Sequence, residues 1–406
     1  MVARHLRGRV SHELPEPSAY GVPTAQGQVI DAIELPARYP WRFYGLAWLA
    51  IIVGVIAFLD VMPALLRPQG LTGFMVALAY ALVPVTIIAV FVWFVDRWEP
   101  EPAWLYASSF LWGCGVSALL ASILNSALAV RISQASETIP IELASSAYVA
   151  PFVEEIIKGS GVVLLYIFFR RYFDGEVDGI VYGALIGAGF SFTENIVYFV
   201  RNYDEIELIF RYRFLDGPLN HEAWTAVFGF IIGLSVYSRR KAAAWIAIAP
   251  AWLFAALGHW VNNVSLTWPG MTYQRYVLLN NVPIAIVLTV LIIYSRDAQQ
   301  KAVARGLSDY ERAGWLAPSE IRMIMNLRLR KRARSWAETR AREAGAQGGS
   351  GANAMREFQR ALLQLGLART KALRTGTVND PGNRELEADL LHTITDIRRV
   401  FTGLRS

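Results

Sequence analysis

The sequence predicts an all-α, polytopic membrane protein, and three observations support this fold class. Hydrophobic residues make up 54% of the 406 positions. This apolar excess is concentrated between Trp41 and Ser295. Within that stretch, apolar windows of about 20 residues recur, and each is long enough for a helix to cross a bilayer. We therefore expect about eight transmembrane helices, followed by a cytoplasmic helical region.

The residues before the first apolar window predict a disordered tail. Residues 1–40 contain five prolines and scattered charges but no apolar run. The first hydrophobic segment starts too late and is too long to be the core of a signal peptide.

Eight apolar windows follow, and together we expect them to form one membrane domain, residues 41–295. Their approximate bounds are 43–66, 71–95, 103–130, 146–169, 178–200, 219–238, 242–264 and 276–295. Twelve basic residues flank the window ends on one side of the membrane and six flank those on the other. Because cytoplasmic loops carry the excess of Lys and Arg, we expect both termini in the cytoplasm.

The fourth window contains charges that a lipid-buried helix would normally avoid, namely Glu154, Glu155 and Lys158. Each costs roughly 2.5–3.5 kcal/mol at the centre of a membrane helix, which favours a functional site. Glu154 and Lys158 are four residues apart and share a helix face, so an internal ion pair is the structural alternative. Glu155 points about 100° away and is not explained by that pair.

The fifth window combines a glycine face with a further carboxylate. Gly179, Gly183 and Gly187 recur every four residues, a pattern that lets another helix backbone approach closely. Glu194 and Asn195 lie further along the same helix.

The sixth and seventh windows supply two histidines. His221 opens the sixth window, and His259 lies one turn before Asn263 near the end of the seventh. A rise of about 1.5 Å per residue places both histidines, Glu154 and Glu194 in the same leaflet. We therefore expect one composite site.

This set of residues suits hydrolysis of an amide bond. A buried glutamate beside a water can act as a general base, and neutral histidines can donate hydrogen bonds to a developing oxyanion or bind a metal. The HExxH zinc signature is absent, because Thr225 stands where the second histidine would be. We favour a metal-free site, with His221, His259 and either Glu194 or Glu154 as the ligands if zinc is bound.

Four ordered motifs resemble those of the PrsW family of intramembrane proteases. They are the EExxK motif Glu154-Glu155-Ile156-Ile157-Lys158, the FxxxEN motif ending at Glu194-Asn195, the histidine His221, and His259 followed by Asn263. The resemblance covers about residues 70–295. It implies a peptidase of the bacterial plasma membrane, related to the CAAX prenyl protease superfamily.

The resemblance also implies a substrate class. In the best-known branch of this family the substrate is a single-span anti-sigma factor, cut on its extracytoplasmic side. We expect Glu154 or Glu155 to activate the water and Glu194 to share or shuttle the proton. Lys158 would tune the acidic pair, while Asn195 and Asn263 suit an oxyanion or backbone-holding role.

After Ser295 the composition is typical of a soluble protein. Residues 296–344 predict basic helices, with arginines and a lysine at 322–334 that suit anionic lipid headgroups rather than nucleic acid. Residues 345–353 predict a flexible linker. Two amphipathic stripes in 354–406 predict a helical hairpin for partner contact or self-association.

Two other functions fit the same membrane domain. The intramembrane carboxylates can relay protons or hold a cation in a transporter, although the two halves show no internal repeat. A non-catalytic scaffold that displays the C-terminal hairpin is the third interpretation.

Overall fold

The computed structural model describes residues 41–136, 138–170, 172–217, 219–240, 242–265 and 267–403. Within these ranges the chain forms helices joined by turns and contains no β-strand, which confirms the all-α prediction. The predicted tail, residues 1–40, lies outside the described residues. The chain divides into two compact units, of which one ends at Ser295 and the other begins at Arg296.

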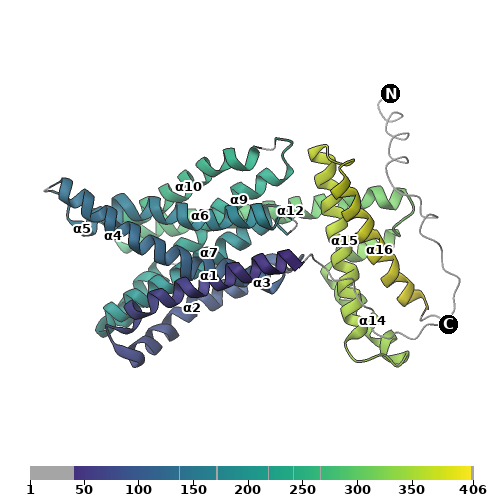
Figure 1. The fold of residues 1–406 in the computed structure, drawn as a ribbon, viewed down its shortest axis with the longest axis horizontal. Coiled ribbons are helices and arrows are strands. Elements are labelled where there is room, and N and C mark those ends of the chain that lie inside the picture. Colours follow the sequence, from purple (N-terminus) through teal and green to yellow (C-terminus); the bar gives the residue numbers. More distant parts are fainter. Residues whose placement is uncertain are drawn as a thin grey trace. The chain divides into compact units, whose positions relative to one another are not determined.

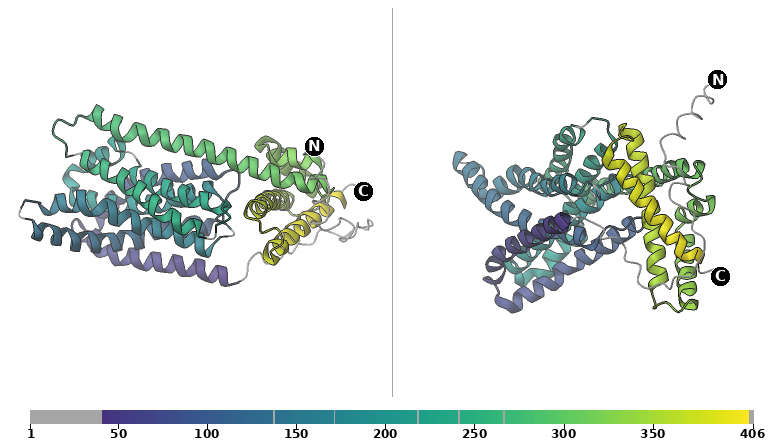
Figure 2. Two further views of the ribbon diagram at one scale, coloured as in Figure 1. Left: turned by 90° about the horizontal axis from the view of Figure 1, so that it is seen from above. Right: turned by 45° about the vertical axis from the view of Figure 1, so that its right-hand side comes forward.

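The unit that ends at Ser295, here called the membrane unit, is a bundle of helices that run side by side (Figure 1, Figure 2). Its longer helices are α1 (Trp41–Leu66), α2 (Gly70–Asp96), α3 (Ala103–Leu111), α4 (Ala118–Ala135), α6 (Ala150–Phe168), α7 (Glu176–Arg201), α9 (Asn220–Leu234), α10 (Ala243–Ser265) and the first part of α12 (Val282–Arg312). The short helices are α5 (Ile141–Leu143), α8 (Ile206–Phe210) and α11 (Tyr273–Tyr276). A π-helical turn, Trp112–Ser117, joins α3 to α4.

Six segments of the described chain are long and apolar enough to cross a membrane. They are Trp48–Leu66, Gly70–Asp96, Ala103–Ala135, Glu176–Arg201, Ala243–Ser265 and Tyr273–Arg312. The two remaining predicted windows form α6, which carries three charged residues, and α9, which has only 15 residues. The multi-pass helical fold is thus confirmed, while the number of eight crossings stays a prediction. These two helices, which do not meet the length and charge criteria for a membrane span, both carry candidate site residues.

Helix α7 is the central helix of the membrane unit, because 89% of its membrane-spanning window is buried. It packs against α9 through the predicted glycine face. A Cβ atom added to Gly179 would lie 2.1 Å from the carbonyl oxygen of Gly229, and one added to Gly183 would lie 2.2 Å from that of Thr225. Only glycine permits so close an approach. The predicted small-residue face is confirmed, and it sets the spacing between two helices of the site.

The second unit, here called the C-terminal unit, contains the end of α12 followed by α13 (Pro318–Ile324), α14 (Leu327–Glu343), α15 (Ser350–Thr375) and α16 (Pro381–Gly403). Most residues of the two predicted apolar stripes are buried on α15 and α16, including Phe358, Leu362, Leu365, Ile394 and Ile397. The described residues of the two regions predicted as separate, 296–344 and 354–406, lie in one compact unit.

The structure shortens the predicted linker, because α15 begins at Ser350 rather than after residue 353. The carboxylate of Glu338 accepts backbone hydrogen bonds from Gly349 at 2.7 Å and from Ala352 at 3.1 Å. These bonds satisfy donors at the start of α15 that have no partner within the helix. The hydrogen bond from Gly349 is also the main cause that lowers the pKa of the Glu338 carboxyl.

Candidate active site

The charged residues of α6 are buried, and Glu155 is fully engaged. The side chains of Glu155 and Lys158 are 0% exposed. Oε1 of Glu155 accepts from Nζ of Lys158 at 2.5 Å and faces Nδ1 of His259 at 3.0 Å. The ion pair on this helix therefore joins Lys158 to Glu155, three residues away, and not to Glu154 as the spacing of four suggested. Both spacings bring side chains together on a helix, and the additional contact with His259 favours Glu155.

Only one of the two carboxylate oxygens of Glu154 has a hydrogen-bond partner among the described residues. Its Oε1 accepts from Nδ2 of Asn125 on α4 at 2.9 Å. Its Oε2 lies 4.0 Å from Nδ1 of His221, and it is a buried atom without a hydrogen-bond partner among the described residues. Buried polar atoms are nearly always satisfied, so an unpartnered carboxylate oxygen indicates a place for a ligand or a reacting group.

The hydrogen bonds of the two histidines define which nitrogen of each ring carries the hydrogen. An ionised carboxylate can only accept, so Nδ1 of His259 donates to Glu155 and its Nε2 keeps a lone pair. His221 is arranged the other way round. Its Nε2 donates to Oε2 of Glu194 at 2.9 Å, and its Nδ1 lone pair accepts from Nζ of Lys158 at 3.1 Å.

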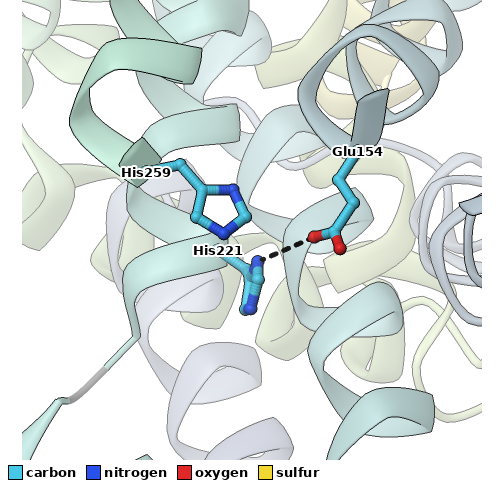
Figure 3. A group of neighbouring side chains, drawn as sticks. All are labelled: Glu154, His221 and His259. Carbon is cyan, nitrogen blue, oxygen red and sulfur yellow. Dashed lines mark ion pairs between the residues drawn. The ribbon is translucent and has the colours of Figure 1, made fainter. Parts of the chain in front are cut away.

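One ring nitrogen of each histidine converges with Glu154 at one point of the bundle. One ligand atom from each of Glu154, His221 and His259 lies within 4.8 Å of the others (Figure 3). The two imidazole rings meet edge to face with their centroids 5.0 Å apart. His221, at the start of α9, reaches this centre directly. The structure thus brings the five predicted residues Glu154, Glu155, Glu194, His221 and His259 into one connected cluster.

The two predicted supporting asparagines lie beside this cluster and make hydrogen bonds to other segments. Oδ1 of Asn195 accepts from Nε of Arg213 at 2.5 Å. Nδ2 of Asn263 donates to the backbone carbonyl of Ser146 at 2.9 Å, and so ties α10 to the start of α6. The predicted oxyanion or backbone-holding role of the two asparagines stays a prediction.

Sequence reasoning missed Arg213 as a site residue. It lies on the π-helical turn Arg211–Asp216, and its Nη2 is 2.5 Å from Oε2 of Glu194. Its guanidinium also lies 4.1 Å from the ring centroid of Tyr198. The sequence counted Arg213 only among the basic residues of a loop, because nothing in the local pattern shows that this loop folds back onto α7.

A second missed residue is Glu222, whose buried Oε2 has no hydrogen-bond partner among the described residues. With Glu154, Glu155 and Glu194 it makes four carboxylates around the site, against the two cations of Lys158 and Arg213. If all six groups are ionised, two negative charges remain. One divalent cation would balance them.

The cluster opens into a cavity of about 1460 Å³ within the membrane unit. Glu154, Glu194, His221, His259 and Asn263 all lie on its wall. Helix α4 contributes a wall of mostly small side chains, among them Ala118, Ala121, Ser122, Ser126 and Ala129. The cavity is therefore large enough to admit a peptide segment to the unpartnered oxygen of Glu154.

Fold and site together define a polytopic membrane protein with a carboxylate and histidine centre buried between its helices. Residues 101–293 match the model of a family described as PrsW family intramembrane metalloprotease. The resemblance inferred from the four motifs is thus confirmed over residues 101–293, which are similar to the PrsW family.

Two similar proteins are both named Protease PrsW. The one from Geobacillus kaustophilus is 28% identical over 147 residues, which cover 36% of this chain and 60% of the relative. The one from Bacillus subtilis is 28% identical over 136 residues, which cover 30% of this chain and 61% of the relative. The chain thus spans about three fifths of the length of these relatives. No solved structure gives a significant match.

Proposed function

We propose that the membrane unit is an intramembrane peptidase that hydrolyses a peptide bond of a membrane-protein substrate. The observation that carries this proposal is the unpartnered Oε2 of Glu154, which faces the lone pairs of two histidines on a cavity wall. A polarised or deprotonated water at this point is the reagent that amide hydrolysis needs. The two relatives named Protease PrsW support the same reaction class.

The donor set also fits a divalent cation. A catalytic zinc takes three protein ligands and leaves one position open, and two imidazole nitrogens with one carboxylate oxygen form such a set. In addition, the far nitrogen of each histidine is held by a carboxylate, His259 by Glu155 and His221 by Glu194. Carboxylates in this position orient the histidines of metal sites.

We therefore propose that Glu154, His221 and His259 hold a divalent metal ion, which would replace the hydrogen bond that Lys158 donates to Nδ1 of His221. When bound, such an ion acidifies a water and polarises the scissile carbonyl. The metal-free mechanism favoured from the sequence stays a prediction. The carboxylate partner of each histidine favours the alternative ligand set, which was also named from the sequence.

The remaining residues of the cluster have separate roles in this proposal. Glu155 orients His259 and neutralises Lys158, and its burial keeps it away from the substrate. Glu194 is 23% exposed, and only its Oε2 is engaged, by Arg213 and His221, among the described residues. Its second oxygen is free to take the proton that the attacking water gives up.

The substrate is proposed to be a single membrane-spanning segment, and the expectation of an anti-sigma factor stays a prediction. We also propose that the protein lies in the bacterial plasma membrane with both termini in the cytoplasm. A single cysteine placed at Ser136 should react with an impermeant label on intact cells, whereas one at Gln347 should react only after permeabilisation. Labelling at Gln347 in intact cells would reverse this orientation.

The test of the reaction is cleavage of single-span peptides by the purified chain, followed by mass spectrometry. Glu154→Gln and Glu194→Gln keep the side-chain shape but remove a carboxylate, so both folded variants should lose cleavage. Glu205→Gln, at an exposed site on the η4 turn (Tyr203–Glu205), should cleave like the wild type. Full activity in both site variants would contradict the proposal and favour a transporter or a scaffold.

A further inference from the structure

Among the described residues, Asn125 links α4 to the charged cluster by a side-chain hydrogen bond. Its Nδ2 donates to Oε1 of Glu154 at 2.9 Å. This bond fixes one oxygen of the carboxylate and leaves Oε2, the other oxygen, toward His221. Asn125 is thus placed to orient the group on which the proposed function depends.

The other polar atom of the same side chain has no partner. Oδ1 of Asn125 is buried and accepts no hydrogen bond from any described residue, exactly as for Oε2 of Glu154. The two side chains lie on the same cavity wall. The hydrogen bond between Asn125 and Glu154 therefore has an unsatisfied acceptor on each side of it.

An amide oxygen can only accept, so the missing partner of Oδ1 is a hydrogen-bond donor. Backbone N–H groups inside an α-helix are already bonded within the helix. A peptide bond under attack must lie in a locally unwound segment, and its neighbouring N–H groups then need new acceptors in a site with little water. Around Asn125 the α4 wall is formed by small residues such as Ala121, Ser122 and Ala129, over which such a segment can lie closely.

We propose that Asn125 is a positioning residue for Glu154 and that its Oδ1 accepts a backbone N–H from an unwound substrate segment lying along α4. The inference rests on the proposed function and adds the form in which the substrate is bound. The two polar atoms of Asn125 have different roles in this inference. Nδ2 orients the carboxylate of Glu154 for the reaction, and Oδ1 binds the substrate backbone.

The test replaces single backbone N–H groups of a substrate by ester oxygens. A synthetic single-span peptide that the wild-type chain cleaves is prepared with one ester at each of several bonds flanking the scissile bond. At the position whose N–H donates to Oδ1 of Asn125, the ester should lower kcat/KM of the wild type roughly tenfold. The effect should arise mainly through KM, because one hydrogen bond to a buried acceptor is lost.

The variants divide the two roles. Asn125→Leu should lower kcat and should lose the sensitivity to the ester at that position. Asn125→Asp keeps an acceptor but places a second carboxyl group against Glu154 in place of the amide donor, so it should lower kcat and retain the ester sensitivity. Ser133→Ala, also on α4 but away from the cavity, should behave like the wild type. Size-exclusion profiles and melting curves verify that each variant is folded.

Two results would overturn the inference. If the wild type shows no ester-sensitive position, or if Asn125→Leu keeps the ester sensitivity of the wild type, then Oδ1 does not bind the substrate backbone. A wild-type chain that cleaves no single-span peptide at all would contradict the proposed function, and the inference with it. Cleavage by the wild type thus distinguishes failure of the inference from failure of the function.

Discussion

Nδ1 of His259 lies 3.0 Å from Oε1 of Glu155, a carboxylate that is 0% exposed and that also binds Lys158. This contact fixes the orientation of the imidazole ring and directs its Nε2 lone pair away from Glu155. The adjacent carboxylates of α6 therefore differ in role. Glu154 faces the cavity with an oxygen that has no hydrogen-bond partner among the described residues, whereas Glu155 accepts a hydrogen bond from Nδ1 of His259.

Removing the charge of Glu155 should weaken metal binding without removing a ligand. In Glu155→Gln, His259 keeps a hydrogen-bonding neighbour but loses the carboxylate that raises its basicity. We expect affinity for zinc to fall roughly 10- to 100-fold. The measurement is a competition titration with a chromophoric chelator, with Glu205→Gln as the matched control. Unchanged affinity in the folded Glu155→Gln protein would show that Glu155 does not support the metal ligand.

The glycine face of α7 predicts a stability effect of a single added methyl group. In Gly183→Ala the new methyl group would lie 2.2 Å from the carbonyl oxygen of Thr225, so α7 and α9 must separate. Overpacking of this kind costs about 1–3 kcal/mol, and we expect a lower melting temperature in detergent. Gly45→Ala on α1 has no neighbouring atom within 4 Å and should melt like the wild type. Equal melting of the two variants would contradict the close packing of α7 on α9.

The C-terminal unit should show a pH dependence that originates at Glu338. The hydrogen bond from Gly349 lowers the pKa of this carboxyl, so its folded-state pKa lies below the unfolded value. The stabilisation is therefore present above the unfolded pKa of about 4.3 and is lost as the pH falls through the folded pKa.

Hydrogen exchange at the start of α15 measures this effect. At pH 7, Glu338→Gln should expose residues 349–353 to faster exchange than the wild type, and the difference should shrink at acidic pH. Glu343→Gln, an exposed residue of the same helix, is the control. A difference between wild type and Glu338→Gln that persists unchanged at pH 3 would contradict the assignment.

We propose that the basic start of α14 contacts anionic lipid headgroups, as the sequence at 322–334 suggested. Arg328, Lys331 and Arg332 are exposed and form no ion pair with any described residue. The exposed Leu329 and Trp336 on the same helix are the apolar neighbours expected of an interfacial surface. Each basic residue near an anionic surface contributes about 1 kcal/mol.

The lipid contact is tested on the full chain in bilayer discs. Hydrogen exchange across residues 327–335 should be slower with phosphatidylglycerol than with phosphatidylcholine, and the difference should fall as salt rises. Replacing Arg328, Lys331 and Arg332 together by Gln should abolish the difference, whereas Arg340→Gln should preserve it. Equal exchange in the two lipids would refute the contact.

The fold class and the members of the site could be predicted because the signals are local. Apolar windows report membrane helices directly, and a glutamate or histidine inside such a window is costly enough to indicate function. The glycine spacing on α7 likewise predicted its close packing. These signals depend on residue type and spacing along one helix.

The pairing of side chains could not be predicted, because it depends on contacts between helices far apart in the sequence. Spacing alone favoured Glu154 as the partner of Lys158, whereas His259 on α10 and Thr225 on α9 approach Glu155. Arg213 was missed because its loop returns to α7. Asn125 could not be paired with Glu154 from the sequence, because the two residues lie 29 positions apart on different helices.

The central claim is that Glu154, His221 and His259 hold a divalent metal ion that peptide cleavage requires. It is tested most directly by measuring metal content and cleavage of a single-span peptide on one purified wild-type sample, before chelation, after chelation and after metal is returned. The account predicts one bound metal ion per chain, loss of cleavage when it is removed and recovery when it is restored. Full cleavage by the metal-free sample would contradict the claim and would support the metal-free glutamate mechanism.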